Sequence, residues 1–288
     1  MTASSLDLSD RDELRPLAEM VAAMHEAKPD ARFLLVGAMA RDLLLGYAHG
    51  IQAQRATEDI DFAFAIPDWR AYEELREALI GGGGFVEVPR VMHRLLFAGQ
   101  RRVDLVPFGG VEDPNGAIEW PPPHEYRMVV LGFREAMASA VQVQLPGGTA
   151  VAVASLQAQA VLKLFAWGDR RHMQRGKDAG DLWLLLRNYL DAGNRERLYA
   201  EAMHLLEADD YDDDLAGAWL LGFDARQLLM FGSGADNIAL KGAVDLLAGD
   251  AADGPVQLAT DMHTLDLQHA VDMLRACHAG LSGAMGVA

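Results

Sequence analysis

The sequence predicts an α+β protein in which a mixed sheet with flanking helices is followed by a helical bundle. Up to residue 154, short apolar or alternating runs separated by turn residues are typical of strands that alternate with helices. From residue 155 onward, apolar residues recur at helical spacing almost without interruption. A length of 288 residues with 51% hydrophobic side chains suits one large core or two smaller ones. This shift in pattern predicts two domains, 1–154 and 155–288.

The overall charge argues against a broad nucleic-acid surface. The formal net charge is −17 and the pI about 4.8, whereas non-specific nucleic-acid binding depends on neutralising phosphates with basic residues. A local basic groove, bound metal ions and cationic substrates remain compatible with this charge. The N-terminus lacks the basic and apolar regions of a signal peptide, and no apolar run approaches the about 20 residues of a membrane span. With Cys277 as the single cysteine, in a structural role, we expect a cytoplasmic protein without membrane contact.

The first elements follow from start signals, apolar runs and glycines. The chain begins with helical spacing after a Ser/Asp start signal. A short apolar run follows, then a second helical pattern led by Gly37, and then polar residues. The expected elements are, in order, a helix, a buried strand, a short helix ending near Gly46 and a loop: residues 9–27, 32–36, 38–47 and 47–57.

Alternating runs then predict most of the remaining sheet. A strand over 59–65 precedes a helix that starts at Pro67, and a tight turn at Gly99 and Gln100 joins the last two of three further strands. Residues 109–127, rich in Gly, Pro and acidic side chains, are expected to be a surface excursion. Two alternating runs around a Pro-Gly-Gly sequence predict a hairpin over 140–154. The three strands are expected at residues 85–88, 93–99 and 101–108.

The second half is predicted to contain helices throughout. They are expected at residues 155–168, 176–191, 194–208, 212–231, 236–248 and 264–280.

Three aspartates carry the strongest functional signal. Asp59 and Asp61 lie two residues apart on a predicted strand, so their side chains share one face. Because neighbouring carboxylates repel each other unless cations neutralise them, this spacing suits Mg²⁺, which prefers hard oxygen ligands. Asp104 lies in a second apolar strand, where an unpartnered carboxylate is costly. If the two strands are neighbours, the three carboxylates can bind two metal ions about 4 Å apart, and Asp104 can accept the proton of an attacking hydroxyl.

Gly37 follows a strand and precedes a helix. Because it has no side chain, a triphosphate can approach the backbone amides at the start of that helix, where the helix dipole favours anions.

Three segments together resemble the DNA polymerase β-like nucleotidyltransferase superfamily: residues 37–42 (GAMARD), 57–62 (TEDIDF) and 103–106 (VDLV). Within it, Arg55, Thr57, Asp59 and Asp61, and the later run 163–182, are most similar to the nucleotidyltransferase toxins of the AbiEii/AbiGii kind. The resemblance covers about residues 30–190.

The resemblance implies an enzyme that transfers a nucleoside monophosphate from an NTP to an acceptor and releases pyrophosphate. It implies a catalytic domain over 1–154 and a helical domain over 155–288 that completes the cleft for nucleotide and acceptor. The implied cofactor is Mg²⁺ or Mn²⁺, held by Asp59, Asp61 and Asp104, with Lys163 as a further catalytic residue. The nucleotide-binding residues implied are Gly37, Ala38, Arg41, Arg55, Thr57, Arg175, Lys177, Asp178 and Asp181. Ala38 departs from the family pattern of Gly or Ser, since it offers no hydroxyl to a phosphate.

Several of these residues also have simple structural interpretations. Lys163 lies on an apolar helix, where its stem can pack and its amine can reach solvent. Lys177 and Asp181 have the spacing of an ordinary helical ion pair. Arg41 and Asp42 can pair with each other.

Three functions remain open from the sequence. The first is NMP transfer to RNA, such as tRNA, or to protein by the toxin of a toxin–antitoxin or phage-defence pair, with a cognate antitoxin as partner. The second is transfer to a small cationic molecule such as an aminoglycoside, which the acidic balance favours. The third is a non-catalytic descendant that only binds nucleotide or a partner.

Overall fold

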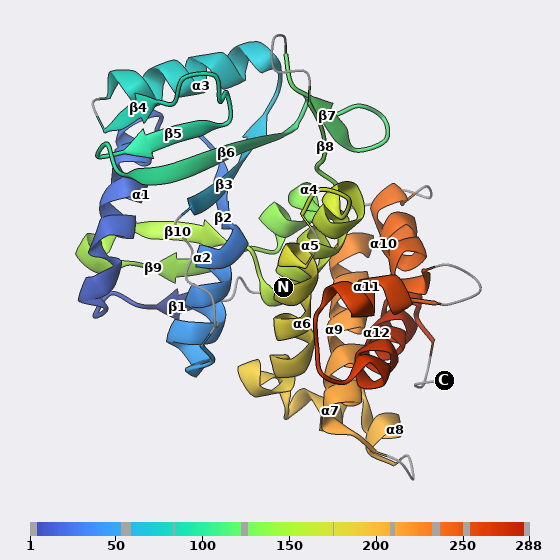
Figure 1. Cartoon of the computed structure of the whole chain (residues 1–288). Helices are drawn as coiled ribbons and strands as arrows, with labels where there is room; N and C mark the ends of the chain where they lie inside the picture. The colour runs from blue at the N-terminus through green and yellow to red at the C-terminus, as the bar shows by residue number, and fades with distance from the viewer. Residues whose placement is uncertain are drawn as a thin grey trace. The chain divides into compact units, whose positions relative to one another are not determined.

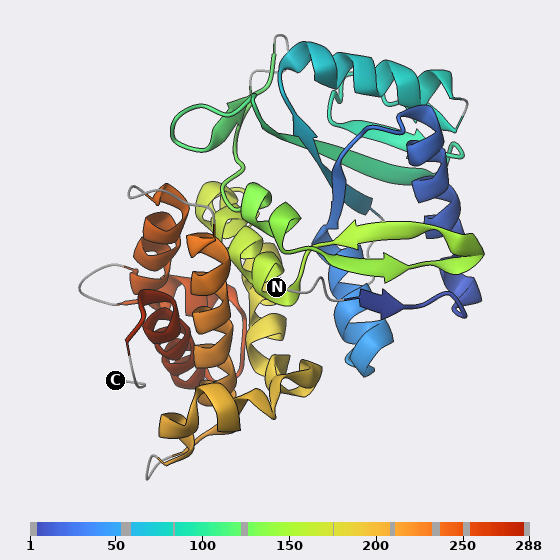
Figure 2. The same cartoon turned by 180° about the vertical axis from the view of Figure 1, so that it is seen from behind.

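The computed structural model describes residues 5–52, 59–82, 84–121, 126–174, 176–207, 211–231, 237–249 and 254–284. The described residues form two compact units (Figures 1 and 2). One is an α/β unit that contains the residues up to Ala48 and those from Gln52 to Ser155. The other is a helical unit that contains His49–Ile51 and the residues from Leu156 onward. The α+β class and the helical second half predicted from the sequence are confirmed.

The α/β unit is built on an eight-stranded sheet with the order β1-β9-β10-β2-β3-β6-β5-β4. The sheet is mixed as predicted, because β3 runs parallel to β6 but antiparallel to β2. The predicted hairpin is present as the antiparallel pair β9 and β10. The strands are β1 (Ser5–Asp7), β2 (Phe33–Val36), β3 (Asp59–Ile66), β4 (Phe85–Glu87), β5 (Arg94–Phe97), β6 (Arg101–Gly109), β9 (Val141–Gln144) and β10 (Ala150–Val153).

One face of β3 supplies much of the core of this unit. Phe62 and Phe64 alternate with the aspartates along the strand, and both pack against Phe33 of β2. The ring of His25 from α1 lies 4.8 Å from that of Phe33, so α1 covers this apolar face. The alternation places Asp59 and Asp61 on the opposite face. The helices are α1 (Arg15–Ala27), α2 (Gly37–Arg41), a π-helical segment η2 (Asp42–Tyr47), α3 (Trp69–Gly81) and α4 (Phe133–Ala138), with two 3-10 turns, η1 (Asp12–Leu14) and η3 (Pro146–Gly148).

The prediction of a surface excursion over 109–127 is wrong in part. Residues 117–119 form β7 (Ala117–Glu119), which pairs with β8 (Arg127–Val129) in a second, two-stranded sheet. Trp120 is only 3% exposed, and its ring packs against those of Trp69, Tyr72 and His93. The segment therefore closes an aromatic core, which its Gly- and Pro-rich composition does not reveal.

Other boundaries in this unit also differ from the predictions. The first helix begins at Arg15, with a proline in its first turn, and is preceded by η1. The helix after Gly37 does not end near Gly46: it changes to π-helical geometry at Asp42, and Ala48 and His49 still continue it. Residues 53–58 of the predicted loop lie outside the described residues. No element was expected at β1 or α4, which are only three and six residues long.

The helical unit contains the expected helices with three differences. The helix expected over 194–208 is two short helices separated at Ala202, and a π-helical turn precedes them, in which Gly193 adopts a φ of 86°. An additional helix, α11, was not expected. The helices are α5 (Leu156–Arg170), α6 (Lys177–Asn188), η4 (Leu190–Asn194), α7 (Arg197–Glu201), α8 (Met203–Leu206), α9 (Asp213–Met230), α10 (Ile238–Ala248), α11 (Val256–Asp261) and α12 (Leu267–Ser282).

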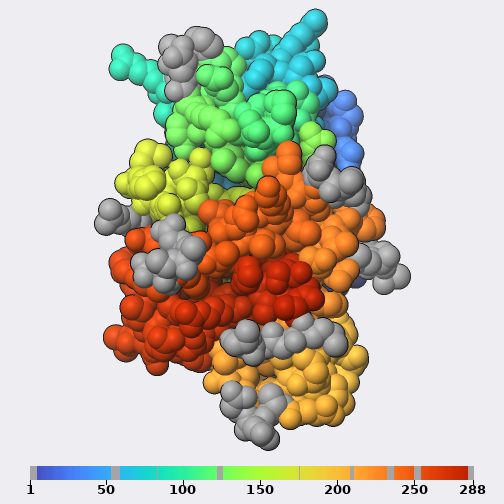
Figure 3. Space-filling view, turned by 90° about the vertical axis from the view of Figure 1, so that its right-hand side faces the viewer, coloured from blue at the N-terminus to red at the C-terminus, as the bar shows by residue number. Residues whose placement is uncertain are grey.

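The central pair of this unit is α9 and α12, whose backbones approach closely at glycines. A Cβ atom at Gly222 or Gly280 would lie only 2.0 or 2.1 Å from a backbone oxygen of the other helix, so a side chain at either position is excluded. In the space-filling view, segments of the C-terminal third, orange to red, make up much of the helical unit's visible surface (Figure 3). No helix within the described ranges is long and apolar enough to cross a bilayer.

Candidate active site

The register between β3 and β6 brings the predicted aspartates to neighbouring backbone positions. Asp61 lies directly opposite Asp104 in the parallel pairing, and Asp59 lies opposite Arg102. Neighbouring strands are about 4.8 Å apart, and residues opposite each other point to the same face of a sheet. The condition set by the sequence, that the strand of Asp104 neighbours that of Asp59 and Asp61, is therefore met. We refer to Asp59, Asp61 and Asp104 as the aspartate cluster.

Arg94 is the principal cation of this cluster. It lies on β5 directly opposite Asp104 in the antiparallel pairing with β6. Its Nε donates to Oδ1 of Asp104 at 2.6 Å, one Nη donates to Oδ2 of Asp104 at 2.7 Å, and the same Nη donates to Asp59 at 3.3 Å. Arg102 adds a weaker contact of 3.3 Å to the other oxygen of Asp59. The guanidinium thus binds Asp104 with two parallel hydrogen bonds, the strongest geometry for such a pair.

The electrostatics of Arg94 reflect all three carboxylates. Hydrogen bonding to Asp104 raises the pKa of Arg94 above its ordinary value despite partial burial, and the charges of Asp104, Asp59 and Asp61 raise it further. The side chains of Asp104 and Arg94 are 15% and 25% exposed, so screening by water is incomplete. Arg94 therefore stays protonated and acts as a fixed positive charge.

The aspartate cluster fits a divalent cation in its chemistry, because it offers hard carboxylate oxygens from two adjacent strands. In this arrangement, however, both oxygens of Asp104 already accept hydrogen bonds from Arg94. Within the part of the chain that the structure describes, no group of three His, Cys, Asp or Glu is arranged to hold a metal ion. A cation at Asp104 therefore competes with Arg94 for the lone pairs that accept these bonds and is repelled by its charge.

Position 37 requires a glycine because of its backbone conformation and its closeness to Asp61. Its φ is 69°, a conformation that residues with side chains rarely adopt, and a Cβ atom there would lie 2.2 Å from Oδ2 of Asp61. The same glycine begins α2 directly after β2, whose Val36 lies opposite Asp61. The absence of a side chain at position 37 thus leaves room for the Asp61 carboxylate.

The other residues predicted in this unit have varied surroundings. Ala38 is half-buried in the first turn of α2. Arg41 is buried, with 4% exposure, and donates two hydrogen bonds to Asp42 at 2.9 and 2.7 Å. The pair expected from the sequence is therefore present. Arg55 and Thr57 lie outside the described residues.

The residues predicted in the helical unit form a separate ion-pair network. Lys163 on α5 lies 3.2 Å from Asp178 and 2.5 Å from Asp181, and Arg170 donates two hydrogen bonds to Asp178 at 2.7 and 2.8 Å. Asp178 is 1% exposed: burial by itself raises its pKa, but the hydrogen bonds from Arg170 and the charge of Lys163 outweigh burial, so the pKa is lowered. Lys177 is the exposed first residue of α6, and Arg175 lies outside the described residues.

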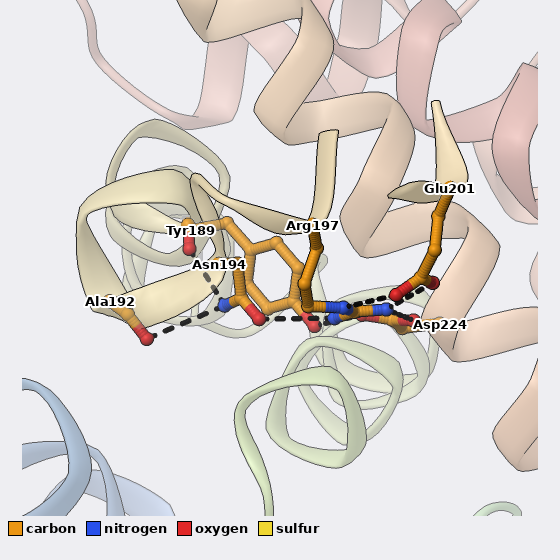
Figure 4. Close-up of polar contacts among 6 residues, drawn as sticks. All are labelled: Tyr189, Ala192, Asn194, Arg197, Glu201 and Asp224. Atoms are coloured by element: carbon orange, nitrogen blue, oxygen red, sulfur yellow. Dashed lines mark hydrogen bonds and ion pairs between the residues drawn. The ribbon is translucent and has the colours of Figure 1, made fainter. Parts of the chain in front are cut away.

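A second arginine-centred network in the helical unit was not anticipated from the sequence. Arg197 binds Asp224 through two hydrogen bonds of 2.6 and 2.7 Å and Glu201 through two of 2.8 and 2.7 Å (Figure 4). It also donates to Asn194, and the buried hydroxyl of Tyr189 donates to Asp224. In Figure 4 Asp224, Glu201 and Asn194 present oxygen acceptors to the Arg197 guanidinium.

Arg94 was likewise not singled out from the sequence, although a signal for it exists. The predicted turn at Gly99 and Gln100 fixes the register of the hairpin, in which Phe97 lies opposite Arg101 and, by counting outward, Arg94 lies opposite Asp104. A basic residue directly across from a carboxylate in an apolar strand is its natural partner.

A family model described as nucleotidyl transferase AbiEii toxin, type IV TA system, matches residues 20–247 of the chain. This match includes the aspartate cluster, Arg94 and the Lys163 network. None of the curated proteins matches the chain.

Several solved structures are similar at low level. The antibiotic-resistance factor ANT(2'')-Ia is 15% identical over 67% of this chain and 99% of its own, with a TM-score of 0.35. JHP933 from Helicobacter pylori is 15% identical over 94% of both chains, with a TM-score of 0.34. The CCA-adding enzyme of Thermotoga maritima complexed with tRNA is 12% identical over 93% of this chain and 67% of its own, with a TM-score of 0.25. These likenesses are too weak to assign a substrate.

Proposed function

The chain belongs to the AbiEii nucleotidyltransferase family, and from this premise we propose that it transfers an NMP from an NTP in a divalent-metal-dependent reaction at the aspartate cluster. One observation carries the proposal: Asp61 and Asp104 are direct neighbours across β3 and β6, with Asp59 on the same face. Membership of the family makes the protein a nucleotidyltransferase. The metal, the residues and the acceptor belong to the proposal.

The proposed reaction is an in-line displacement at the α-phosphorus of the NTP. An acceptor hydroxyl oxygen forms a bond to the α-phosphorus, and the bond from that phosphorus to the oxygen leading to the β-phosphate breaks. Pyrophosphate leaves with the electron pair of the broken bond, and a carboxylate oxygen of Asp104 accepts the proton of the attacking hydroxyl.

The proposed cation is Mg²⁺ or Mn²⁺. Asp59, Asp61 and Asp104 hold it through carboxylate oxygens, and when bound it neutralises negative charge on the phosphates. Gly37 contributes by leaving space for the Asp61 carboxylate, which its hypothetical Cβ atom would displace. Ala38 and Arg41 remain predicted nucleotide contacts on the helix that follows.

The roles predicted for Lys163, Lys177, Asp178 and Asp181 stay predictions. Two aspartates compensate the charge of Lys163 within the helical unit, so a structural role explains its position without a nucleotide. Replacing Lys163 with Met, which keeps an apolar stem, distinguishes the two roles. A catalytic lysine requires loss of NMP transfer in a variant that remains folded.

The proposed biological role is that of the toxin in a toxin–antitoxin pair, with RNA or protein as the acceptor and a cognate antitoxin as partner. The description of the matching family as a type IV toxin supports this role. The net charge of −17 favours an acceptor recognised locally rather than along an extended nucleic-acid surface.

The test supplies each NTP in turn, labelled in its α-phosphate, with Mg²⁺ and a cell extract. RNA, protein and small-molecule fractions are then separated and counted. We expect metal-dependent labelling of RNA or protein by the wild type and none by Asp61→Asn. Labelling of the small-molecule fraction alone supports the alternative of a small cationic acceptor, which the acidic composition favours. An absence of labelling with every NTP contradicts the proposed reaction.

A further inference from the structure

Arg94 occupies the place in the aspartate cluster where a cation is needed. Two of its nitrogens bind both oxygens of Asp104, and one of them also reaches Asp59, so a single guanidinium bridges carboxylates on β3 and β6. Divalent ions and guanidinium groups use the same carboxylate lone pairs, and both neutralise the repulsion between neighbouring carboxylates. A metal ion that takes the lone pairs now accepting from Arg94 must displace it, and one that takes the remaining lone pairs is repelled by its charge.

Because Arg94 is part of β5, it stays beside the aspartate cluster, whereas a free counter-ion exchanges with solvent. The cross-strand register fixes its Cα opposite that of Asp104, so its effective concentration at the carboxylate is high. Its side chain is 25% exposed, which leaves part of the guanidinium at the surface of the unit, where solvent can reach it. Arg102, whose side chain is 47% exposed, lies at a longer distance of 3.3 Å from Asp59 and is the weaker competitor.

We propose that Arg94 is a built-in competitor of the divalent metal, which holds Asp104 and Asp59 in the metal-free protein and releases Asp104 when the metal–triphosphate complex binds. This inference rests on the proposed function of the aspartate cluster and adds a device that controls its metal affinity. In the absence of nucleotide a metal ion binds weakly, because it must displace Arg94 from Asp104 without the help of phosphate oxygens. The triphosphate assists because it brings further oxygen ligands for the ion and acceptors for the released guanidinium.

The device has a consequence for positioning as well. Before metal binds, the two parallel hydrogen bonds from Arg94 fix the orientation of the Asp104 carboxylate, the proposed base of the reaction. Arg94 thus positions Asp104 only in the metal-free protein. A lysine at this position keeps the charge but cannot form the paired hydrogen bonds, so charge and geometry can be separated experimentally.

The test measures Mn²⁺ binding to the full chain without nucleotide, from the electron paramagnetic resonance signal of free Mn²⁺. We expect Arg94→Gln to bind Mn²⁺ about tenfold more tightly than the wild type, since two charge-assisted hydrogen bonds no longer compete. Arg94→Lys should lie between the two, and Arg102→Gln should show a smaller gain than Arg94→Gln. The matched control is Arg70→Gln, which breaks another arginine–carboxylate pair of the same unit, on the exposed surface of α3.

A second measurement links the gain to Asp104. In the double variant Arg94→Gln with Asp104→Asn the tighter binding should be lost, because the released ligand is absent. In EDTA, Arg94→Gln should melt at a lower temperature than the wild type, and saturating Mn²⁺ should restore more stability to it than to the wild type.

Equal Mn²⁺ affinity of the folded wild type, Arg94→Gln and Arg94→Lys overturns the inference, and the proposed function survives if Mn²⁺ with NTP still binds to them. If none of these proteins binds Mn²⁺ even with NTP, the metal-dependent function fails together with the inference. If Arg94→Gln does not fold, the comparison of Arg94→Lys with the wild type decides alone.

Discussion

Two arginine-centred clusters, one in each unit, differ in how completely the arginine binds its carboxylates. Arg197 in the helical unit donates two hydrogen bonds to each of Asp224 and Glu201 and one to Asn194 (Figure 4). In the α/β unit, Arg94 and the half-exposed Arg102 face three aspartates. The side chain of Asp59 is 30% exposed, whereas that of Asp224 is 11% exposed.

This difference predicts a structural role for the Arg197 cluster and a functional role for the aspartate cluster. A network in which one guanidinium binds each carboxylate through two hydrogen bonds stabilises one arrangement and leaves little for a ligand to improve. A cluster in which three carboxylates lie at neighbouring positions on two strands has a repulsion that a further cation relieves. We therefore expect substitutions in the aspartate cluster to change activity more than stability, and substitutions around Arg197 to do the reverse.

The largest expected effect is on activity, at Asp61. Asp61→Asn should lower NMP transfer by about a thousandfold or more, because a metal's stabilisation of phosphate charge contributes several kcal/mol. Its melting temperature should change little, since the substitution keeps the size of the side chain and removes one of three like charges. Initial rates of label transfer and thermal unfolding check both parts. If Asp61→Asn is inactive only because it is unfolded, the expectation that this residue affects activity more than stability is contradicted.

The next effect is on stability, at Asp224. Asp224→Ala leaves Arg197 and the buried Tyr189 without their shared acceptor, and we expect a loss of about 2–3 kcal/mol in the free energy of unfolding. This is below the range for a fully buried pair, because Arg197 is 32% exposed and keeps Glu201. Urea unfolding measures the loss. Mn²⁺ affinity of the folded variant should be unchanged, and a marked change in it removes the contrast between the clusters.

A smaller loss is expected where a glycine faces the aspartate cluster. Gly37→Ala forces a side chain into a left-handed conformation at about 1–2 kcal/mol and also displaces Asp61. Gly99→Ala is a matched control, since its φ is also 69° but no atom lies within 4 Å of the added carbon. Both variants should lose similar backbone stability in urea, whereas Gly37→Ala alone should lose most of its NMP transfer. Equal activity of the two variants argues against a role for the Gly37–Asp61 contact.

The smallest effect concerns the pH dependence of stability at Asp178. Its pKa in the folded protein is lowered from 3.8, so its ion pairs stabilise the fold above about pH 4, and this contribution disappears as the pH falls through the lowered pKa. The difference in urea midpoint between the wild type and Asp178→Asn should therefore be constant near neutral pH and shrink below pH 4. A difference that stays constant in acid shows that the network does not depend on the charge of Asp178.

The parts of the fold that repeat a simple pattern could be predicted from the sequence. Alternation along 59–65 and 101–108 indicates β3 and β6, and the Pro-Gly-Gly sequence indicates the β9–β10 hairpin. Elements whose stability comes from residues distant in the sequence could not be predicted. β1 is three residues long and pairs with β9, and Trp120 is buried by rings of α3 and of His93. Local composition holds no information on such contacts.

The candidate site divides in the same way. The aspartates are visible as carboxylates in apolar strands, and their neighbouring positions depend only on the pairing of β3 with β6. Arg94 resembles any basic residue at the start of a strand until the hairpin register is counted. Arg197 and Glu201 have the spacing of a helical ion pair, but Asp224 lies on α9, so no periodic pattern reveals its contact with Arg197.

The most direct test of the aspartate cluster counts Mn²⁺ ions bound at equilibrium in the presence of a non-hydrolysable NTP analogue. Wild-type protein, Asp61→Asn and Asp104→Asn are compared, with Asp224→Asn as a carboxylate control from the helical unit. The account predicts tight, nucleotide-dependent Mn²⁺ binding by the wild type and Asp224→Asn, and its loss in the other two variants. Unchanged Mn²⁺ binding in folded Asp61→Asn and Asp104→Asn would contradict it.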